Sequence, residues 1–185
     1  QVNRLQAAKD NVGNAMSFSQ TQDGHLKKVG TALDRMSELA TLALDATKTD
    51  TDRGLFEKEF DTLQAHITDL SGSKFNGVAL FSATALAVTK DSDGGSFTAA
   101  AIDIGNSNDN IAKAAVTGIT LTDATTSPSE SQSLTNAKAA LTAVNLGIES
   151  LAAHRATVGA SMSRMEATSS NLSVLKDNIS AANSR

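Results

Sequence analysis

The last third of the chain carries an apolar stripe that advances by three or four residues at a time and contains no proline. A stripe of this period, kept over several heptads, predicts a long helix that lies along another helix. Only Arg155, Ser169 and Lys176 interrupt the pattern. A helix of this kind needs a partner of similar length. The apolar members of the stripe are Ala137, Leu141, Val144, Ile148, Leu151, Val158, Met162, Met165, Leu172 and Ile179.

The first segment of the chain, from Gln1 to about Thr47, carries a matching stripe. Two sets of positions recur there every seven residues and interleave as the a and d positions of a heptad. At about 1.5 Å per residue this helix would be roughly 70 Å long, so we predict that it pairs antiparallel with the C-terminal helix. Ser19, Gln22 and Gly24 weaken its middle. The two sets are Leu5, Val12, Ser19, Leu26, Leu33 and Ala40, and Ala8, Ala15, Gln22, Val29, Met36 and Ala43.

A shorter second helix is predicted from about Asp52 to Ser71. Thr49 and Asp52 have the spacing of a capping box, and Gly72 is the expected C-terminal cap. Its apolar face is the strongest of the three, and we expect it to pack against both long helices. That face consists of Phe56, Phe60, Leu63, Ile67 and Leu70.

The periodicity changes after the turn sequence Asn76-Gly77. Residues 78–89 and 96–104 are rich in β-branched and small residues. They flank a strong turn sequence at 91–95, so we predict a β-hairpin.

The next stretch, 105–126, carries weaker signals. Residues 111–115 fit one helical turn, and residues 116–121 fit a third strand. The sequence Ser-Pro-Ser-Glu at 127–130 then places serine at the N-cap, proline at N1 and glutamate at N3 of the C-terminal helix.

The predicted fold is mainly α: an elongated three-helix bundle of long antiparallel helices, with a small β-hairpin element at one end. Residues 1–81 form the first two helices, 82–126 the hairpin or variable region, and 127–185 the long helix that completes the rod. Neither long helix has a clear signal at its outer end. We therefore expect the full-length protein to continue both helices together.

Composition narrows the function. Aromatic residues make up only 3% of the chain, and alanine, leucine, valine and isoleucine suit thin interfaces between slender helices. The net charge of −4 offers no basic surface for nucleic acid. The chain has no cysteine and no apolar run near the ~20 residues of a membrane span. No catalytic constellation or cofactor motif is present, so we expect neither an enzyme nor a bound cofactor.

Each predicted helix contains one histidine: His25, His66 and His154. Three helices of a bundle can supply one metal ligand each. No His-Glu-x-x-His motif occurs, however, so we interpret the three as polar surface residues and predict no metal site.

Five glycines lie inside the two long predicted helices, where each costs about 1 kcal/mol relative to alanine. Their number indicates either close helix approach or required flexibility. They are Gly13, Gly24, Gly30, Gly147 and Gly159.

Motifs along these helices resemble bacterial flagellin, specifically its rod-like core domain. Residues 33–40, Leu-Asp-Arg-Met-Ser-Glu-Leu-Ala, are similar to that family's Leu-Gln-Arg-Val-Arg-Glu-Leu-Ala block. Residues 155–160, Arg-Ala-Thr-Val-Gly-Ala, resemble its C-terminal Arg-Ala-x-Leu-Gly-Ala motif. The matches occur in order over 1–81 and 134–185. Further similar motifs are Gln20-Thr21-Gln22-Asp23-Gly24, Thr49-Asp50-Thr51-Asp52-Arg53, Phe75-Asn76-Gly77 and the closing residues 178–185.

The resemblance implies a secreted, self-assembling structural subunit of the extracellular flagellar filament, whose partners are other flagellin subunits rather than nucleic acid or membrane. In this family the extreme terminal helices form the inner tube of the filament. We expect the sequence to be a core fragment that lacks these polymerisation helices and stays monomeric. The short middle carries no family motif, so the outer domains are expected to be reduced.

The resemblance also implies a candidate receptor or subunit interface. The family is recognised by a Toll-like receptor of the innate immune system through the core helices. Arg35, Glu38 and Leu39 match the relevant block, Glu59 matches an acidic position on the second helix, and Arg155 lies in the C-terminal motif. An exposed arginine and leucine on a rigid helix suit an interface anchor. The same residues also fit ordinary solvated or subunit-packing positions.

Several observations keep other functions open. Asp34, Ser37 and Leu42 depart from the family block and remove polar or basic groups that the receptor would meet. A hook–filament junction protein shares the helical ends but has different insertions. A flagellin-like cell-surface binding protein uses the same fold to capture a ligand such as a polysaccharide, although a chain without tyrosine or tryptophan offers little for sugar stacking. The Ser/Thr-rich stretch 122–133 is a candidate for O-linked sugars.

Overall fold

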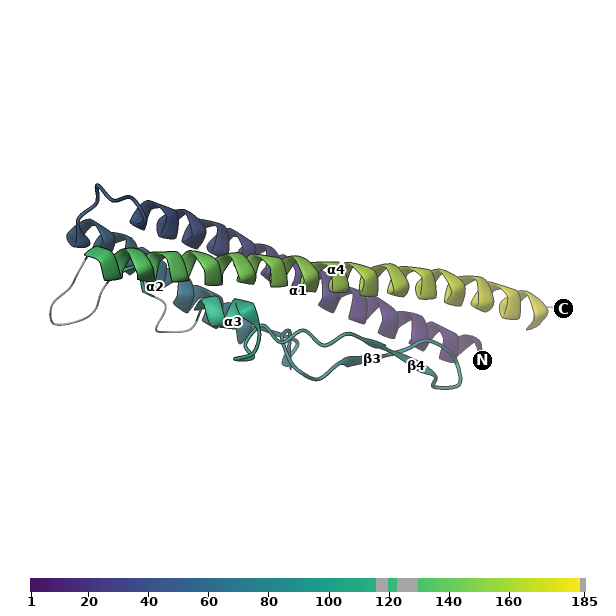
Figure 1. Cartoon of the computed structure of the whole chain (residues 1–185). Coiled ribbons are helices and arrows are strands. Elements are labelled where there is room, and N and C mark those ends of the chain that lie inside the picture. Colours follow the sequence, from purple (N-terminus) through teal and green to yellow (C-terminus); the bar gives the residue numbers. More distant parts are fainter. Residues whose placement is uncertain (116–119, 123–129, 184–185) are drawn as a thin grey trace.

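The computed structural model of the chain describes residues 1–115, 120–122 and 130–183. Two long helices, α1 (Val2–Ala43) and α4 (Glu130–Asn183), lie side by side and run in opposite directions along a rod (Figure 1). Gln6 lies beside Lys176 and, further along the pair, Leu33 lies beside Gly147. The predicted elongated, mainly helical fold with a long antiparallel pair is confirmed.

The predicted stripes of the two long helices form their shared interface. Every position of both seven-residue sets on α1 is buried, including the polar Ser19 and Gln22. On α4 one set is buried except for the half-buried Ile179. The other set lies half-buried at the margin of the interface, except for the exposed Arg155. This margin contains the three polar residues that interrupt the stripe, and Lys176 Nζ donates a hydrogen bond of 2.6 Å to Gln6 Oε1. The buried set is Ala137, Val144, Leu151, Val158, Met165 and Leu172.

The second helix, α2 (Asp50–Ser71), begins with the predicted capping box. The amide of Asp52 donates to Thr49 Oγ1 at 3.3 Å, and the amide of Thr49 donates to the Asp52 carboxylate at 3.0 Å. Gly72 occupies the C-cap as predicted, but its φ of −82° makes no use of the left-handed conformation open to glycine. The predicted extent of the first helix to Thr47 is too long, because α1 ends at Ala43.

The expected packing of α2 against both long helices is only half right. α2 packs on α1, but a short helix, α3 (Asn110–Ala115), takes most of the space between α2 and α4. The helical turn predicted at 111–115 is thereby confirmed. Gln64 Nε2 of α2 donates a hydrogen bond of 3.2 Å to the Ala114 carbonyl. On its other side α3 rests on α4 at Gly147, where a Cβ would lie 3.3 Å from that of Ala114.

The β region contains two hairpins where the sequence predicts one. β1 (Lys74–Phe75) pairs with β2 (Val78–Ala79) across Asn76 and Gly77, whose φ angles are +49° and +82°. β3 (Leu86–Thr89) pairs with β4 (Ser96–Ala99) around the predicted turn. The predicted strand 78–89 is therefore wrong as one element. Its start is already paired with β1, and the chain then turns inward to bury Leu80 and Phe81.

Beyond β4 the predicted strand continues only as an isolated bridge between Ser82 and Ile102. The strand predicted over 116–121 lies largely outside the described residues, and its described members, Thr120 and Leu121, are not in a strand. The predicted cap at 127–129 also lies outside them.

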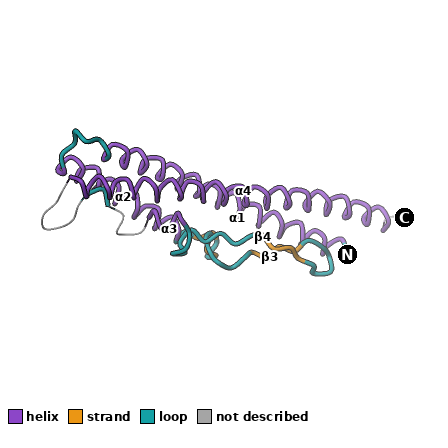
Figure 2. Tube along the Cα trace, viewed as in Figure 1, coloured by secondary structure: helices purple, strands orange, loops and turns teal. Residues whose placement is uncertain are grey.

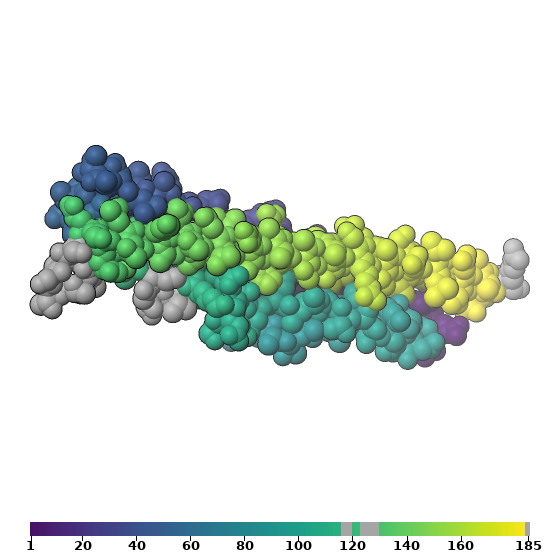
Figure 3. Space-filling view, in the orientation of Figure 1, coloured from purple at the N-terminus to yellow at the C-terminus, as the bar shows by residue number. Residues whose placement is uncertain are grey.

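The third layer of the rod changes its nature along the length of the helix pair. α2 and α3 cover the half that contains the α1–α2 corner, and the β3–β4 hairpin covers the half that contains the termini (Figure 2). Figure 3 shows this β region as a ridge along the flank of α4. Val88 and Phe97 of the hairpin share a small core with Leu5, Val12 and Met165. The guanidinium of Arg164 also lies 4.4 Å from the centre of the Phe97 ring, a cation–π contact that ties α4 to the hairpin.

Close helix approach explains two of the five glycines in the long helices. A Cβ at Gly30 would lie 3.0 Å from Leu151 Cδ2, and Gly147 faces α3. A Cβ at Gly13, Gly24 or Gly159 would meet nothing within 4 Å. These three are therefore not required by packing within the described part of the chain. None of the described helices is long and apolar enough to cross a membrane.

Candidate functional site

Three of the predicted interface residues meet on the surface between α1 and α2. Arg35 Nε and Nη2 donate to the two carboxylate oxygens of Glu59, at 2.6 and 2.9 Å, and Arg35 Nη1 donates to Glu38 at 2.7 Å. The planar guanidinium matches a carboxylate in this two-bonded arrangement. The hydrogen bond from Arg35 lowers the pKa of Glu59, and the two carboxylates raise the pKa of Arg35, Glu59 foremost. We call this group the Arg35 cluster.

Leu39 does not belong to that surface. Only 1% of it is exposed, and it lies in the main hydrophobic core. It continues the line of Ala32 and Met36, which are also buried and lie seven and three residues before it. The apolar face of α1 is wider than the two predicted sets. The expectation of an exposed leucine anchor at position 39 is therefore wrong.

Two other leucines take the exposed positions beside the Arg35 cluster. Leu42 is 40% exposed and lies four residues after Glu38 on α1. Leu55 is 61% exposed and lies four residues before Glu59 on α2. Residues four apart share a helix face, so each leucine adjoins a carboxylate of the cluster. These four-residue spacings are present in the sequence, but they identify the exposed leucines only once the buried faces of both helices are known.

Arg155 belongs to a separate group. Its Nε donates a hydrogen bond of 2.9 Å to Asp23, which also pairs with Lys27 at 3.2 Å. The Arg155 guanidinium is the main cause that lowers the pKa of the Asp23 carboxyl, with Lys27 adding to it. Asp23 and Arg35 are twelve positions apart on α1, about 18 Å along the helix. The four charged residues of the predicted interface thus form two clusters rather than one, and Leu39 belongs to neither.

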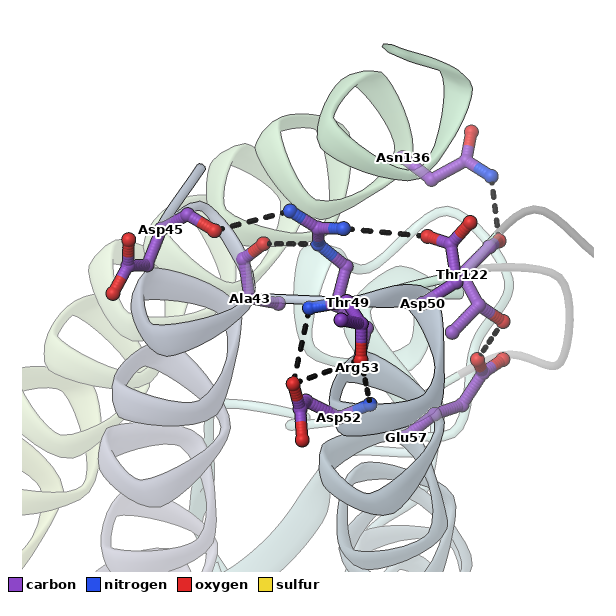
Figure 4. Close-up of polar contacts among 9 residues, drawn as sticks. All are labelled: Ala43, Asp45, Thr49, Asp50, Asp52, Arg53, Glu57, Thr122 and Asn136. Atoms are coloured by element: carbon purple, nitrogen blue, oxygen red, sulfur yellow. Dashed lines mark hydrogen bonds and ion pairs between the residues drawn. The ribbon is translucent and has the colours of Figure 1, made fainter. Parts of the chain in front are cut away.

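A buried arginine at the α1–α2 corner escaped prediction as an individual residue. Arg53 has no exposed surface, and its guanidinium donates to the carbonyls of Ala43 at 2.8 Å and Asp45 at 3.0 Å (Figure 4). It also reaches Asp50 Oδ1 at 3.3 Å. Each of these partners belongs to the end of α1, the corner or the start of α2. Arg53 therefore fixes the direction in which α2 leaves α1.

A second polar group near this corner ties the end of the variable region to the rod. The Thr122 hydroxyl donates to the Glu57 carboxylate of α2, and Asn136 Nδ2 of α4 donates to the Thr122 carbonyl at 2.7 Å (Figure 4). These contacts hold the described residues 120–122 between two helices and give them a structural role.

The histidines differ from the expected surface residues in two cases. His154 Nε2 lies 2.7 Å from Asp109 Oδ2, and Asp109 also accepts a hydrogen bond from the amide of Ile111 at the start of α3. His25 has a buried Nδ1 without a partner among the described residues, and burial lowers its pKa, with the charge of Lys28 adding to this. His66 is exposed as expected. Within the described residues, no three His, Asp or Glu side chains are grouped so as to hold a metal ion.

Sequence comparison covers the two long helices from both ends. Residues 1–85 match the bacterial flagellin N-terminal helical region, and residues 141–185 match the bacterial flagellin C-terminal helical region. The two matches together account for well over half of the chain. The chain belongs to the bacterial flagellin family.

Individual members of the flagellin family agree with this assignment. A flagellin of Halalkalibacterium halodurans is 27% identical over the whole of this chain, which spans 65% of that relative's length. The flagellar filament 41 kDa core protein of Borreliella burgdorferi is 35% identical over 38% of this chain and 21% of its own length. The crystal structure of Bacillus cereus flagellin superposes with a TM-score of 0.69 over 94% of both chains, at 26% identity.

Flagellins are structural proteins rather than enzymes, and the two charged clusters fit that role. Both present rigid, paired charges on the outside of a rod. Such groups serve recognition between surfaces better than chemistry.

Proposed function

We propose that this flagellin-family chain is the core part of a structural subunit of the bacterial flagellar filament, secreted and assembled outside the cell with other flagellin subunits. One observation carries the proposal: the antiparallel α1–α4 pair is where the two flagellin helical regions match, and the whole rod superposes on a flagellin. A rod that repeats head to tail without closing gives an open helical assembly.

Electron microscopy of the full-length protein tests this proposal. The full-length protein is purified as monomer and then examined after polymerisation is induced. We expect long filaments of constant diameter. Polymerisation failing under every condition, with the monomer correctly folded by circular dichroism, would contradict the filament role. It would favour a junction protein or a surface binding protein.

The Arg35 cluster favours a second role, as a contact for an innate immune Toll-like receptor. The support is geometric: a guanidinium held by two carboxylates is flanked by the exposed side chains of Leu42 and Leu55. Arginine at the centre of an interface, with apolar neighbours that exclude water, is a common arrangement of binding hot spots. Leu39 lies in the core and makes no such contact.

A receptor reporter assay tests this second role. In the full-length protein, we expect Arg35→Ala and Leu55→Ala each to reduce signalling potency by about tenfold, the equivalent of about 1.4 kcal/mol of binding energy. Arg4→Ala is the matched control, because Arg4 is also an exposed arginine and its contact with Asp93 is long, at 3.9 Å. Unchanged potency in both test variants would remove the Arg35 cluster from the receptor surface and leave the filament role untouched.

A further inference from the structure

The β3–β4 hairpin has a free edge that lies along a groove beside α1. The groove has a volume of about 370 Å³ and is lined by all four residues of β3, from Leu86 to Thr89. Successive residues of a strand point to opposite faces. A groove that touches four in a row must therefore run along the edge of the strand rather than over one face. Figure 2 shows the hairpin beside α1 near the N-terminus.

The hydrogen-bond pattern identifies which backbone groups face this edge. The amide of Lys90 donates to the carbonyl of Gly95 at 2.8 Å, so this pair belongs to the bonded set of the antiparallel ladder. Bonded and non-bonded pairs alternate, which makes Val88–Phe97 and Leu86–Ala99 bonded pairs. The N–H and C=O groups of Ala87 and Thr89 then point away from β4. Among the described residues, no backbone bond from outside the sheet satisfies them.

The opposite wall of the groove also carries hydrogen-bonding groups. Asn11 and Asn14 of α1 line it, and neither side chain makes a hydrogen bond within the described part of the chain. Phe18 and Leu86 add apolar surface. No described residue that lines the groove is ionisable.

We propose that the free edge of β3 and the facing side of α1 bind an extended strand of another polypeptide, whose side chains are small and uncharged. Unpaired backbone donors and acceptors on a sheet edge are matched by another strand, which bonds through its own backbone. The asparagine amides donate to and accept from the far edge of the added strand. The neutral lining disfavours charged side chains, because they would lose hydration there without gaining a partner.

The probe for this proposal is the neutral peptide acetyl-Thr-Val-Thr-Val-Thr-amide, whose residues favour the extended conformation. Amide hydrogen exchange of the 185-residue chain is followed by NMR with and without the peptide. In the free protein we expect fast exchange at Ala87 and Thr89 and slower exchange at Val88, whose amide bonds to β4. At a peptide concentration nine times the titrated dissociation constant, exchange at Ala87 and Thr89 should slow about tenfold.

Two proline variants separate the groove from the rest of the hairpin. Ala87→Pro removes the N–H that faces the groove and leaves the ladder intact, because proline is tolerated where the amide points away from the sheet. Thr98→Pro is its matched control, since Thr98 lies opposite Ala87 and its N–H points to the outer edge of β4. We expect peptide protection of Thr89 to be lost in the first variant and kept in the second.

Three results would overturn the proposal. The first is slow exchange at Ala87 and Thr89 without peptide, because the edge would then already be covered. The second is exchange that millimolar peptide leaves unchanged. The third is protection that grows with protein concentration alone, which would identify a second copy of this chain as the occupant in place of a foreign strand.

Discussion

Replacing Arg53 should be among the most damaging single changes in the rod. Its guanidinium is wholly buried and supplies donors to two main-chain carbonyls and one carboxylate at the α1–α2 corner. Asp45 is an exposed residue, and the Asp50 side chain is 29% exposed, so water can replace Arg53 at both. Ala43 is fully buried, and its carbonyl would lose its partner without gaining water.

The free energy of unfolding lost on replacing Arg53 has a polar part and a packing part. A buried carbonyl left without a donor costs about 1–3 kcal/mol. The buried stem of the side chain contributes about 2 kcal/mol, from three methylenes at about 0.8 kcal/mol each. We therefore expect Arg53→Ala to reduce the free energy of unfolding by about 4 kcal/mol. Arg53→Met keeps most of the stem and should lose about 2 kcal/mol.

Urea unfolding followed by the helical circular dichroism signal measures these differences at constant pH and salt. Arg4→Ala is the control, because an exposed arginine with a distant partner contributes less than about 1 kcal/mol. If Arg53→Ala unfolds within 1 kcal/mol of Arg4→Ala, the buried network does not hold the corner. If Arg53→Met is as unstable as Arg53→Ala, the packing part of the reasoning is wrong.

Two other predictions follow from the helix surfaces. Gly159→Ala should raise the free energy of unfolding by about 1 kcal/mol, because the added Cβ meets nothing. Gly147→Ala should give no such increase, because the added Cβ crowds α3. Urea unfolding of the two variants measures the difference, and equal increases would contradict it. Arg155→Ala should raise the NMR-titrated pKa of Asp23, since the Arg155 hydrogen bond is the main cause that lowers it. Because the pKa of Asp23 is lowered, the pair contributes its full stability to the fold above the ordinary pKa of aspartate and loses it as the pH falls through the lowered value. The stability of the Arg155→Ala variant should therefore depend less on pH in that acid range. An unchanged pKa of Asp23 in the variant would mean that the contact does not persist in solution.

The long helices could be predicted from the sequence because their stability depends on periodic burial. Each seven-residue set on α1 is buried as its spacing requires, and the same spacing places Arg155 and Lys176 at the margin of the α4 interface. The capping box at Thr49 is local chemistry and was equally readable. Elements that depend on distant partners could not be predicted in this way. The stretch 78–89 has one uniform composition, yet its two ends pair with different strands.

The contacts of the candidate site divide in the same way, into local contacts and contacts that depend on distant elements. The spacing of Arg35 and Glu38 on one helix face predicts their contact, whereas the contact of Arg35 with Glu59 depends on how α2 folds back. Leu39 was misplaced because a periodic stripe gives the centre of a buried face but not its width. That width is set here by a third helix, which widens the buried surface of α1 wherever it packs.

The weak middle of the α1 stripe has a structural cause that the heptad pattern alone does not reveal. Ser19 and Gln22 lie where the third layer changes from helices to the β-hairpins, between the two hydrophobic cores. There the chain leaving β2 presents a main-chain carbonyl to the helix pair, and Gln22 Nε2 donates a hydrogen bond of 2.6 Å to it at Leu80. An apolar residue at position 22 would continue the stripe and leave that carbonyl unpaired at a cost of about 1–3 kcal/mol. The polar residue at position 22 therefore allows the third layer to change from a helix to a hairpin along the same pair of long helices.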